Sequence, residues 1–354
     1  MPADDPALDR LSYAAIVATR NRAEALALSL PLLLAQSRLP AEVVVVDSSD
    51  DPAPVAAVVE ATAKTAPRPV RLVRAKPGLT HQRNVGLSET TAPIVLFPDD
   101  DSLLYPDAAE RILETYERDR EGRLSAIGGR EADRPPQGID QSAAPAEPPP
   151  GPGGRLIRAI RLWVDRRLTG ASPFEHLGRT LNARHRPPDW LAAANCLPVA
   201  YVTGFRMSFR RSALLGFDET LERYAWFEDI DAHLGAMRTG LVVAHLDALV
   251  HHHRFPGPRG DGRTIGRWAV LNRAYVAMKH VRANPEVFPA PGREAWRIRL
   301  HGAIRVAGYL PGVRSAWGRA RLRGALEGWM RVGPLLRADA KALAAAYARA
   351  SAPR

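Results

Sequence analysis

The chain has a single cysteine and no long apolar run, and both absences narrow what it can be. With only Cys196 present, no internal disulfide can form, which fits a reducing compartment, and we interpret this residue as a small buried apolar side chain. No stretch approaches the roughly 18 apolar residues that a membrane span needs. The first residues, with Asp4 and Asp5, lack the basic and apolar regions of a signal peptide. We therefore expect a cytoplasmic protein.

Two ligand-binding motifs are also missing. There is no Gly-x-x-x-x-Gly-Lys-Ser/Thr loop, and this absence argues against a P-loop nucleoside triphosphatase. No nucleic-acid motif and no interleaving of basic with aromatic residues occurs, so we expect no nucleic-acid partner. The sequence does carry an excess of positive charge, with a net charge of +11 over 354 residues. Such a charge attracts anions, for example nucleotides or an acidic membrane surface.

Three acidic residues follow one short apolar run. Residues 94–97 have the length and β-branched character of a buried parallel strand, and Pro98 leads directly into Asp99, Asp100 and Asp101. Carboxylates this close repel one another unless a cation neutralises them. We therefore predict a divalent-metal site, with a solvated acidic turn as the alternative.

Apolar runs alternate with helical patterns over the first 130 residues. We expect strands at residues 13–18, 43–46, 70–73 and 94–97, with helices between them. This alternation predicts a parallel sheet built from βαβ units. The carboxyl ends of such strands meet at one edge, where open α/β sheets bind ligands.

Polar side chains at these strand ends should line one crevice. An acid for a base or ribose hydroxyl, basic groups for phosphate and acids for a metal together favour a nucleotide site. Taken singly, each has a structural alternative, such as a turn cap or a solvated helix face. The candidates at the strand ends and on the helix before the acidic triplet are Thr19, Arg20, Asn21, Asp47, Arg83 and Asn84.

The second half of the chain begins with a stretch rich in proline, glycine and alanine at residues 131–154, which we interpret as a loop or linker. Residues 155–168 follow as a basic amphipathic helix that could lie on a membrane or pack on the domain. Residues 202–211 are expected to form a strand that leads into a helix. Another helix should open at residues 224–231, where Glu228 and Asp229 favour a helix N-terminus.

An apolar strand at residues 241–249 ends in three consecutive histidines, His251, His252 and His253. At most two of the three can share a side of an extended chain, so we expect one functional member, which could complete a metal shell begun by Asp101. Beyond residue 264 the chain is helical and rich in arginine. Basic amphipathic helices can lie on anionic membranes, and solvated helix faces are the alternative.

The ordered set of motifs resembles family 2 of the nucleotide-sugar glycosyltransferases. The likeness covers roughly residues 12–255. It rests on Thr19-Arg20-Asn21, Asp47, the segment 78–86 (GLTHQRNVG), Asp99-Asp100-Asp101, the segment 216–219 (GFDE) and Glu228-Asp229.

The resemblance implies a GT-A fold. The expected class is α/β, with a Rossmann-like, mostly parallel sheet, flanking helices and a helical basic C-terminal region. Residues 1–130 would form the nucleotide-sugar-binding half and 197–262 the acceptor and catalytic half. Residues 131–196 would form the proline-rich insertion and its helix, and 263–354 the C-terminal region.

The resemblance also implies roles for individual residues. Asp229 of the Glu228-Asp229 pair would be the general base of an inverting transfer. Asp101 with His251 or a neighbour would bind Mg²⁺ or Mn²⁺. The donor would contact Thr19, Arg20, Asn21, Asp47, Arg83, Asn84, Asp99 and Asp100. The acceptor side would include Gly204, Trp226, Arg267 and Trp268.

One family motif is missing. The Gln-x-x-Arg-Trp motif of processive synthases is reduced to Arg267-Trp268, and these two residues could equally serve ordinary helix packing. We therefore expect transfer of one sugar to a hydroxyl of a glycan or lipid-linked acceptor. Two other functions are the alternatives to this expectation. These are a sugar nucleotidyltransferase and a non-enzymatic basic protein that binds anionic membrane at the inner face.

Overall fold

The computed structural model describes residues 10–139, 171–221, 226–255 and 261–352. The chain divides into two compact units, residues 1–145 with 182–257 and residues 146–181 with 258–354. The basic helix expected over residues 155–168 lies outside the described residues, as does most of the proline-rich stretch.

A nine-stranded mixed sheet forms the centre of the first unit. Its strands are β1 (Tyr13–Thr19), β2 (Glu42–Asp47), β3 (Val70–Arg74), β4 (Ile94–Phe97), β5 (Ser102–Leu104), β6 (Leu124–Glu131), β7 (Cys196–Pro198), β8 (Met207–Arg210) and β9 (Leu241–His252). The order is β3-β2-β1-β4-β8-β6-β9-β5, with β7 on β9. The first four strands of this order are parallel, and β8 then runs antiparallel to both β4 and β6.

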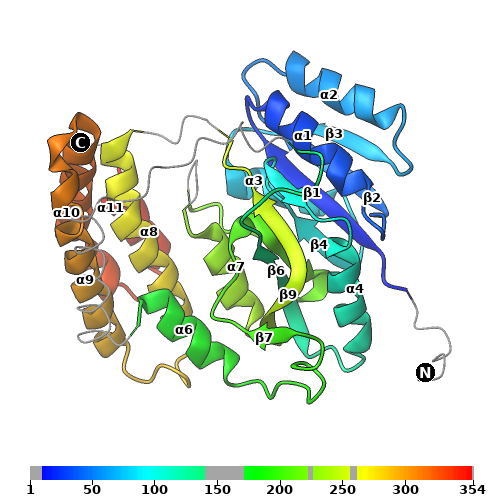
Figure 1. Cartoon of the computed structure of the whole chain (residues 1–354). Helices are drawn as coiled ribbons and strands as arrows, with labels where there is room; N and C mark the ends of the chain where they lie inside the picture. The colour runs from blue at the N-terminus through cyan, green and yellow to red at the C-terminus, as the bar shows by residue number, and fades with distance from the viewer. Residues whose placement is uncertain (1–9, 140–170, 222–225, 256–260, 353–354) are drawn as a thin grey trace. The chain divides into compact units, whose positions relative to one another are not determined.

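Helices flank this sheet in the first unit (Figure 1). They are α1 (Ala23–Leu34), α2 (Ala53–Ala63), α3 (Leu79–Ser88), α4 (Ala108–Arg118) and α7 (Glu228–Ala236); α6 (Pro173–Asn182) crosses the boundary between the units. The parallel strands are buried on both faces, because successive side chains alternate between them. Val17 packs with Leu30 of α1, whereas Ile16 faces Gly86 of α3.

The four strands expected in the first 130 residues all form, and so does the strand before the histidines, which continues through His252. Residues 202–211 differ from the expected strand and helix. They form a 3₁₀ turn, η2 (Gly204–Arg206), then β8, then a second 3₁₀ turn, η3 (Arg211–Ala213). The Arg211 N–H donates to Pro93 O, so the chain stays bound beside β4 where an α-helix would turn away.

The second unit is helical in its described part, as the sequence predicts. It contains α8 (Gly262–Ala283), α9 (Pro291–Ala307), the 3₁₀ turn η4 (Leu310–Arg314), α10 (Ala316–Arg337) and α11 (Leu343–Ser351). Glycines let α8 and α10 approach closely, since a Cβ on Gly324 would lie 1.8 Å from Arg263 O. None of the described helices is long and apolar enough to cross a membrane.

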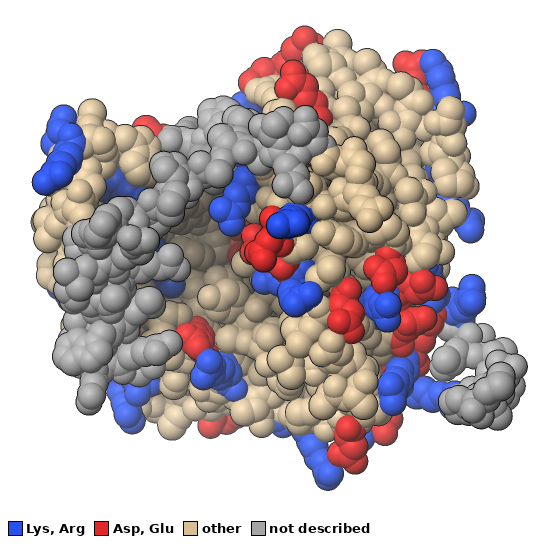
Figure 2. Space-filling model, viewed as in Figure 1, with Lys and Arg blue, Asp and Glu red and all other residues tan. Residues whose placement is uncertain are grey.

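Charged side chains of both signs are interspersed on the face of the first unit that Figure 2 shows. The charged pairs of the first unit include Arg20 with Asp50 at 2.9 Å, on neighbouring segments. Exposed pairs of this kind contribute about 0–1 kcal/mol to stability. This face therefore carries no large patch of one sign.

Candidate active site

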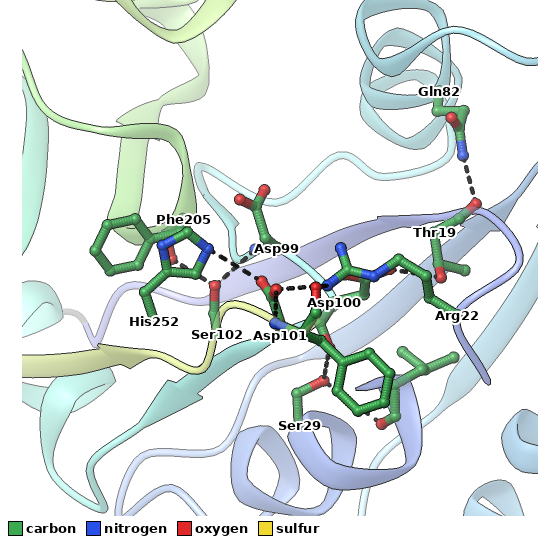
Figure 3. Close-up of polar contacts among 12 residues, drawn as sticks. Thr19, Arg22, Ser29, Gln82, Asp99, Asp100, Asp101, Ser102, Phe205 and His252 are labelled. Atoms are coloured by element: carbon green, nitrogen blue, oxygen red, sulfur yellow. Dashed lines mark hydrogen bonds and ion pairs between the residues drawn. The ribbon is translucent and has the colours of Figure 1, made fainter. Parts of the chain in front are cut away.

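Polar side chains gather where β1, β2 and β4 end, as the parallel arrangement requires. Thr19 and Asp47 are the last residues of β1 and β2 and stand opposite each other in register. Gln82 of α3 ties the two strand ends together, because its Nε2 donates to Thr19 O at 2.8 Å and to Val46 O at 2.9 Å (Figure 3). The strand ends are thus held at fixed spacing.

The acidic triplet divides into one accessible and two buried carboxylates. The side chain of Asp99 is 34% exposed, whereas Asp100 and Asp101 are buried. Asp100 accepts from Thr19 Oγ1 at 2.8 Å and pairs with Arg22 at 2.8 Å. Burial raises the pKa of Asp100 to about 7, although the charge of Arg22 opposes the shift. Asp100 therefore contacts Thr19 and Arg22, two residues of the first strand end.

Asp101 lies at the centre of a group that could hold a metal ion. Ligand atoms of Asp99, Asp101 and His252 all lie within 4.8 Å of one another. Two ligands of one cation at about 2.0–2.6 Å can be separated by at most about 5 Å, so the spacing fits. Asp101 Oδ1 is buried without a hydrogen bond, and His252 Nε2 lies 3.4 Å from it. An orphaned carboxylate oxygen of this kind is suited to a cation.

The histidine of this group is His252, where the sequence analysis had entered His251. Successive residues of β9 point to opposite sides of the sheet. The His251 ring turns away and contacts Ala132 O through Nδ1 at 2.9 Å. The His252 ring stacks on Phe205 at 4.6 Å, which fixes its orientation toward Asp101 (Figure 3).

Arg22 is the main cationic contact of the triplet, and it was not among the predicted site residues. It pairs with Asp100 at 2.8 Å and with Asp101 Oδ2 at 2.5 Å. The Phe255 N–H also donates to Asp101 Oδ2, at 3.0 Å. Burial raises the pKa of Asp101, but the His252 contact and the Arg22 charge outweigh it and hold this pKa below its usual range. Asp101 is therefore ionised.

Arg83 joins the acidic triplet to the second acidic pair. Its guanidinium donates to Asp99 Oδ1 at 2.9 Å and to Glu228 Oε1 at 2.8 Å, and the side chain is only 3% exposed. The ring of Phe217 lies 5.3 Å from the same guanidinium. Arg83 thus brings side chains from α3, from the end of β4 and from α7 into one cluster.

Asp229 is the second residue of α7, and this helix begins directly after Phe227, whose φ of 79° is left-handed. A non-glycine residue in this region is strained and marks a constrained site. Asp229 Oδ2 accepts from the Gly204 N–H and Oδ1 from the Ile230 N–H, both at 2.8 Å. Burial raises the pKa of Asp229, while these N–H groups and Arg83 oppose the shift. Burial likewise raises the pKa of Glu228.

The predicted residues at the first two strand ends bond to neighbouring residues of the β2 and β3 ends. Asp47 is fully buried and accepts from Ser49 N at 2.8 Å and from the Arg74 guanidinium. Arg20 and Asn21 both bond Asp50, at 2.9 and 2.7 Å. These contacts tie the β1 and β2 ends together.

Asn84 holds a loop. Its Nδ2 donates to Phe217 O and to Glu219 Oε1, both at 2.8 Å, and its Oδ1 accepts from Phe217 N at 2.7 Å. The segment 216–219, which the sequence singled out, is therefore docked on α3. Asn84 positions this loop, where the sequence analysis had assigned it to the donor.

The four acceptor-side candidates fall in different parts of the chain. The Gly204 N–H donates to Asp229, and a Cβ on Gly204 would lie 3.2 Å from Arg83 Nη2. Trp226 contacts Phe227 ring to ring at 5.9 Å. Arg267 and Trp268 lie in α8 of the second unit, and the Arg267 backbone packs where Gly328 of α10 approaches.

Sequence reasoning missed Arg22 and Gln82, and for the metal it gave His251 or a neighbour without choosing His252. Arg22 closes the run Thr19-Arg20-Asn21-Arg22, so its position at a strand end was a usable signal. Nothing in the sequence separates Gln82 from its helical neighbours. His252 could be chosen from three histidines only once the register of β9 on β5 was known, where it pairs with Ser102.

Comparison with known proteins gives one family match and solved structures that resemble this chain. Residues 14–155 match the family described as glycosyl transferase family 2. Staphylococcus aureus TarS (residues 1–349), in complex with UDP-GlcNAc, is 13% identical over 96% of this chain and 90% of its own, with a TM-score of 0.52. Mannosyltransferase PcManGT from Pyrobaculum calidifontis, in complex with GDP-Man and Mn²⁺, is 16% identical over 97% and 86%, with a TM-score of 0.49.

The likeness to TarS shows a shared fold and so confirms the expected α/β GT-A class. The same protein in complex with UDP gives a TM-score of 0.50 at 13% identity, over 96% of this chain and 90% of its own. No match was found among curated proteins.

Proposed function

The chain is a glycosyltransferase with a family 2 domain at residues 14–155, and we propose that it moves a single sugar from a nucleotide-sugar donor to a hydroxyl acceptor with inversion. The observation that supports this most directly is the guanidinium of Arg83. It bonds Asp99, a member of the metal-binding group, and Glu228, the neighbour of Asp229. The residues proposed to bind the donor diphosphate and the residue proposed to accept the proton thus lie in one cluster.

Asp229 is the proposed general base. A sugar hydroxyl is a weak nucleophile, so a carboxylate removes its proton as the oxygen attacks the anomeric carbon. The new C–O bond forms as the bond from that carbon to the diphosphate oxygen breaks, and the opposite approach of the two oxygens inverts the centre. The Gly204 and Ile230 N–H groups each bond one oxygen of Asp229 and fix its orientation.

Glu228 is the less suitable base because it is buried and paired with Arg83 at 2.8 Å. Its proposed role is to keep Arg83 aligned toward the donor diphosphate. Asp99, the accessible carboxylate of the triplet, pairs with Arg83 through Oδ1 and is proposed to face the ribose. Four residues are proposed to shape the nucleoside end of the crevice: Thr19, which bonds Asp100; Asp47, which bonds Arg74; and Arg20 and Asn21, which both bond Asp50.

Asp99, Asp101 and His252 are the residues proposed to hold Mg²⁺ or Mn²⁺. Their spacing and the orphaned Asp101 oxygen fit a small divalent cation. When bound, such an ion would offset the charge of the leaving nucleoside diphosphate. Arg22 keeps the Asp101 carboxylate ionised for this task.

The proposed acceptor is a glycan or a lipid-linked intermediate of cell-surface glycan synthesis, glycosylated at the cytoplasmic face of the membrane. The acidic and basic residues of the site support transfer from a nucleotide sugar. TarS in complex with UDP-GlcNAc and PcManGT in complex with GDP-Man make uridine and guanosine donors a sensible first panel.

The test compares Asp229→Asn with Glu228→Gln. We expect Asp229→Asn to lower turnover about 10²–10⁴-fold, as loss of a general base does, while donor binding is kept. Glu228→Gln should lower turnover less than Asp229→Asn does, and it should lower the affinity for the donor. Turnover and donor affinity are measured separately, by product formation and by calorimetry.

Full turnover by Asp229→Asn would overturn the assignment of the base. A preparation that joins a sugar phosphate to a nucleoside triphosphate, and that never transfers sugar to a hydroxyl, would instead favour a sugar nucleotidyltransferase. A protein that binds no nucleotide sugar at all would contradict the proposed function.

A further inference from the structure

The positive charge of the chain lies in its C-terminal part. Residues 258–354 contain 19 Lys and Arg residues against 5 Asp and Glu, an excess larger than the net charge of +11 for the whole chain. The rest of the chain is therefore slightly acidic. A charge bias confined to one helical unit needs an explanation that a transferase site in the first unit does not supply.

A groove in the second unit collects part of this charge. It has a volume of about 600 Å³ and lies between the start of α9 and the end of α10. Arg282, Arg299 and Arg337 line it together with the apolar side chains of Trp296, Leu336 and Pro291. No acidic residue is among the described side chains that line it. The groove thus offers cationic groups beside an apolar wall.

The three arginines have no anionic partner within the described part of the chain. Arg282 donates through one terminal nitrogen to Leu336 O at 3.1 Å, and its Nε is buried without any hydrogen bond. The Arg299 guanidinium lies 5.2 Å from the centre of the Trp329 ring. A buried donor with no acceptor is costly, and a phosphate oxygen would satisfy it.

Exposed apolar side chains adjoin the groove. Trp296 on its wall is 60% exposed and Met330 of α10 is 65% exposed. Along α10 the exposed positions Arg323, Leu326, Met330 and Arg337 recur at helical spacing, so they form one stripe that ends in the groove. A stripe that mixes arginine with large apolar residues is typical of helices that lie in the head-group layer of a membrane.

We propose that the second unit binds an anionic phospholipid surface, with a lipid phosphate held in the groove by Arg282, Arg299 and Arg337. Trp296 and Met330 enter the head-group layer beside it. The apolar wall distinguishes this occupant from a free phosphate, which would leave these side chains in water. The inference does not depend on the proposed sugar transfer, because it rests on the second unit alone.

The experiment is flotation of the full chain with vesicles, without donor or acceptor. We expect binding to vesicles of phosphatidylcholine mixed with phosphatidylglycerol, weaker binding at high salt, and none to phosphatidylcholine alone. The double variant Arg299→Gln/Arg337→Gln should lower the affinity roughly 10- to 30-fold, as loss of two basic contacts does. Trp296→Ser should also lower the affinity for vesicles, although it leaves the charge of the protein unchanged.

The matched control is Lys341→Gln/Arg349→Gln, which removes the same charge from exposed positions outside the groove. This control should keep most of the affinity. Equal losses of vesicle affinity in both double variants would overturn the assignment of the groove as the lipid site and would show that only net charge matters. Displacement by inorganic phosphate at the concentration of lipid phosphate would assign the groove to a soluble phosphate compound, and so would an unchanged affinity of Trp296→Ser.

Discussion

At the scale of single residues, the choice of His252 over His251 is the sharpest structural result. His252→Ala removes a ligand that Phe205 orients toward Asp101. We expect metal affinity to fall about 10–100-fold, the range found when the groups that orient or complete a metal site are lost. Isothermal titration with Mn²⁺ measures this directly.

His251→Ala is the control, because the His251 ring bonds the carbonyl of Ala132 and lies beside the His253 ring, outside the group of Asp99, Asp101 and His252. Its metal affinity should stay within about two-fold of the parent, since that ring lies outside the metal group. If both variants lose the metal equally, the group of Asp99, Asp101 and His252 is not the metal site.

The raised pKa of Asp229 predicts how turnover depends on pH. The base acts as the carboxylate, so activity is present above the pKa of Asp229 and is lost as pH falls through it. Because burial raises this pKa, the acid limb of kcat/KM should lie above the value of about 4 for an ordinary carboxyl. The profile is measured at saturating metal; a limb at or below about 4 contradicts the burial of this group.

At the scale of elements, Gly86, the last residue of the segment 78–86, allows α3 to pack closely on the sheet. A Cβ at Gly86 would lie 2.3 Å from Ile16 Cγ2 and 3.1 Å from Val46 Cγ2, both on buried strands. Alanine would gain about 1 kcal/mol of helix propensity. Overpacking a core costs about 1–3 kcal/mol, so the clash should outweigh that gain.

We therefore expect Gly86→Ala to lower the Tm by a few degrees, because about 1 kcal/mol corresponds to roughly 2–4 °C in a domain of this size. Ser88→Ala is the control on the same helix, since Ser88 is exposed and bonds only Val85 O. Calorimetry of both variants measures the difference. A Gly86→Ala protein as stable as its parent would show that α3 can shift away from the sheet.

Element order was largely predictable, because each buried parallel strand appears in the sequence as a short apolar run. The strands β1 to β4 and the strand before the histidines follow from such runs. The error at residues 202–211 has a local cause. Arg211 bonds Pro93 O across the sheet, and a contact made by residues so distant in sequence leaves no periodic signal.

At the scale of the whole molecule, donor binding should stabilise the protein through linkage. A ligand that binds only the folded state at about 100 times its dissociation constant adds roughly 2.7 kcal/mol to the free energy of unfolding. We expect one nucleoside diphosphate with Mn²⁺ to raise the Tm by several degrees. Asp101→Ala should abolish the metal-dependent part, and a shift that persists in this variant would contradict the metal assignment.

The sequence by itself determined the fold class, the resemblance to glycosyl transferase family 2 that residues 14–155 bear out, and the strand ends where polar residues gather. It could do so because buried strands, acidic clusters and their order are properties of neighbouring residues. Asp99, Asp101, Arg83 and Asp229 were named on that basis, and the structure brings them into one cluster.

Only the tertiary structure decided what each polar group contacts. Asn84 holds the loop 216–219, Asp47 bonds Arg74, and Arg22 pairs with two acids of the triplet. Register on β9 turned His252 and not His251 toward Asp101. The physical reason is that a hydrogen bond or an ion pair depends on position in space to within an ångström, whereas the sequence pattern fixes only the order of the groups along the chain.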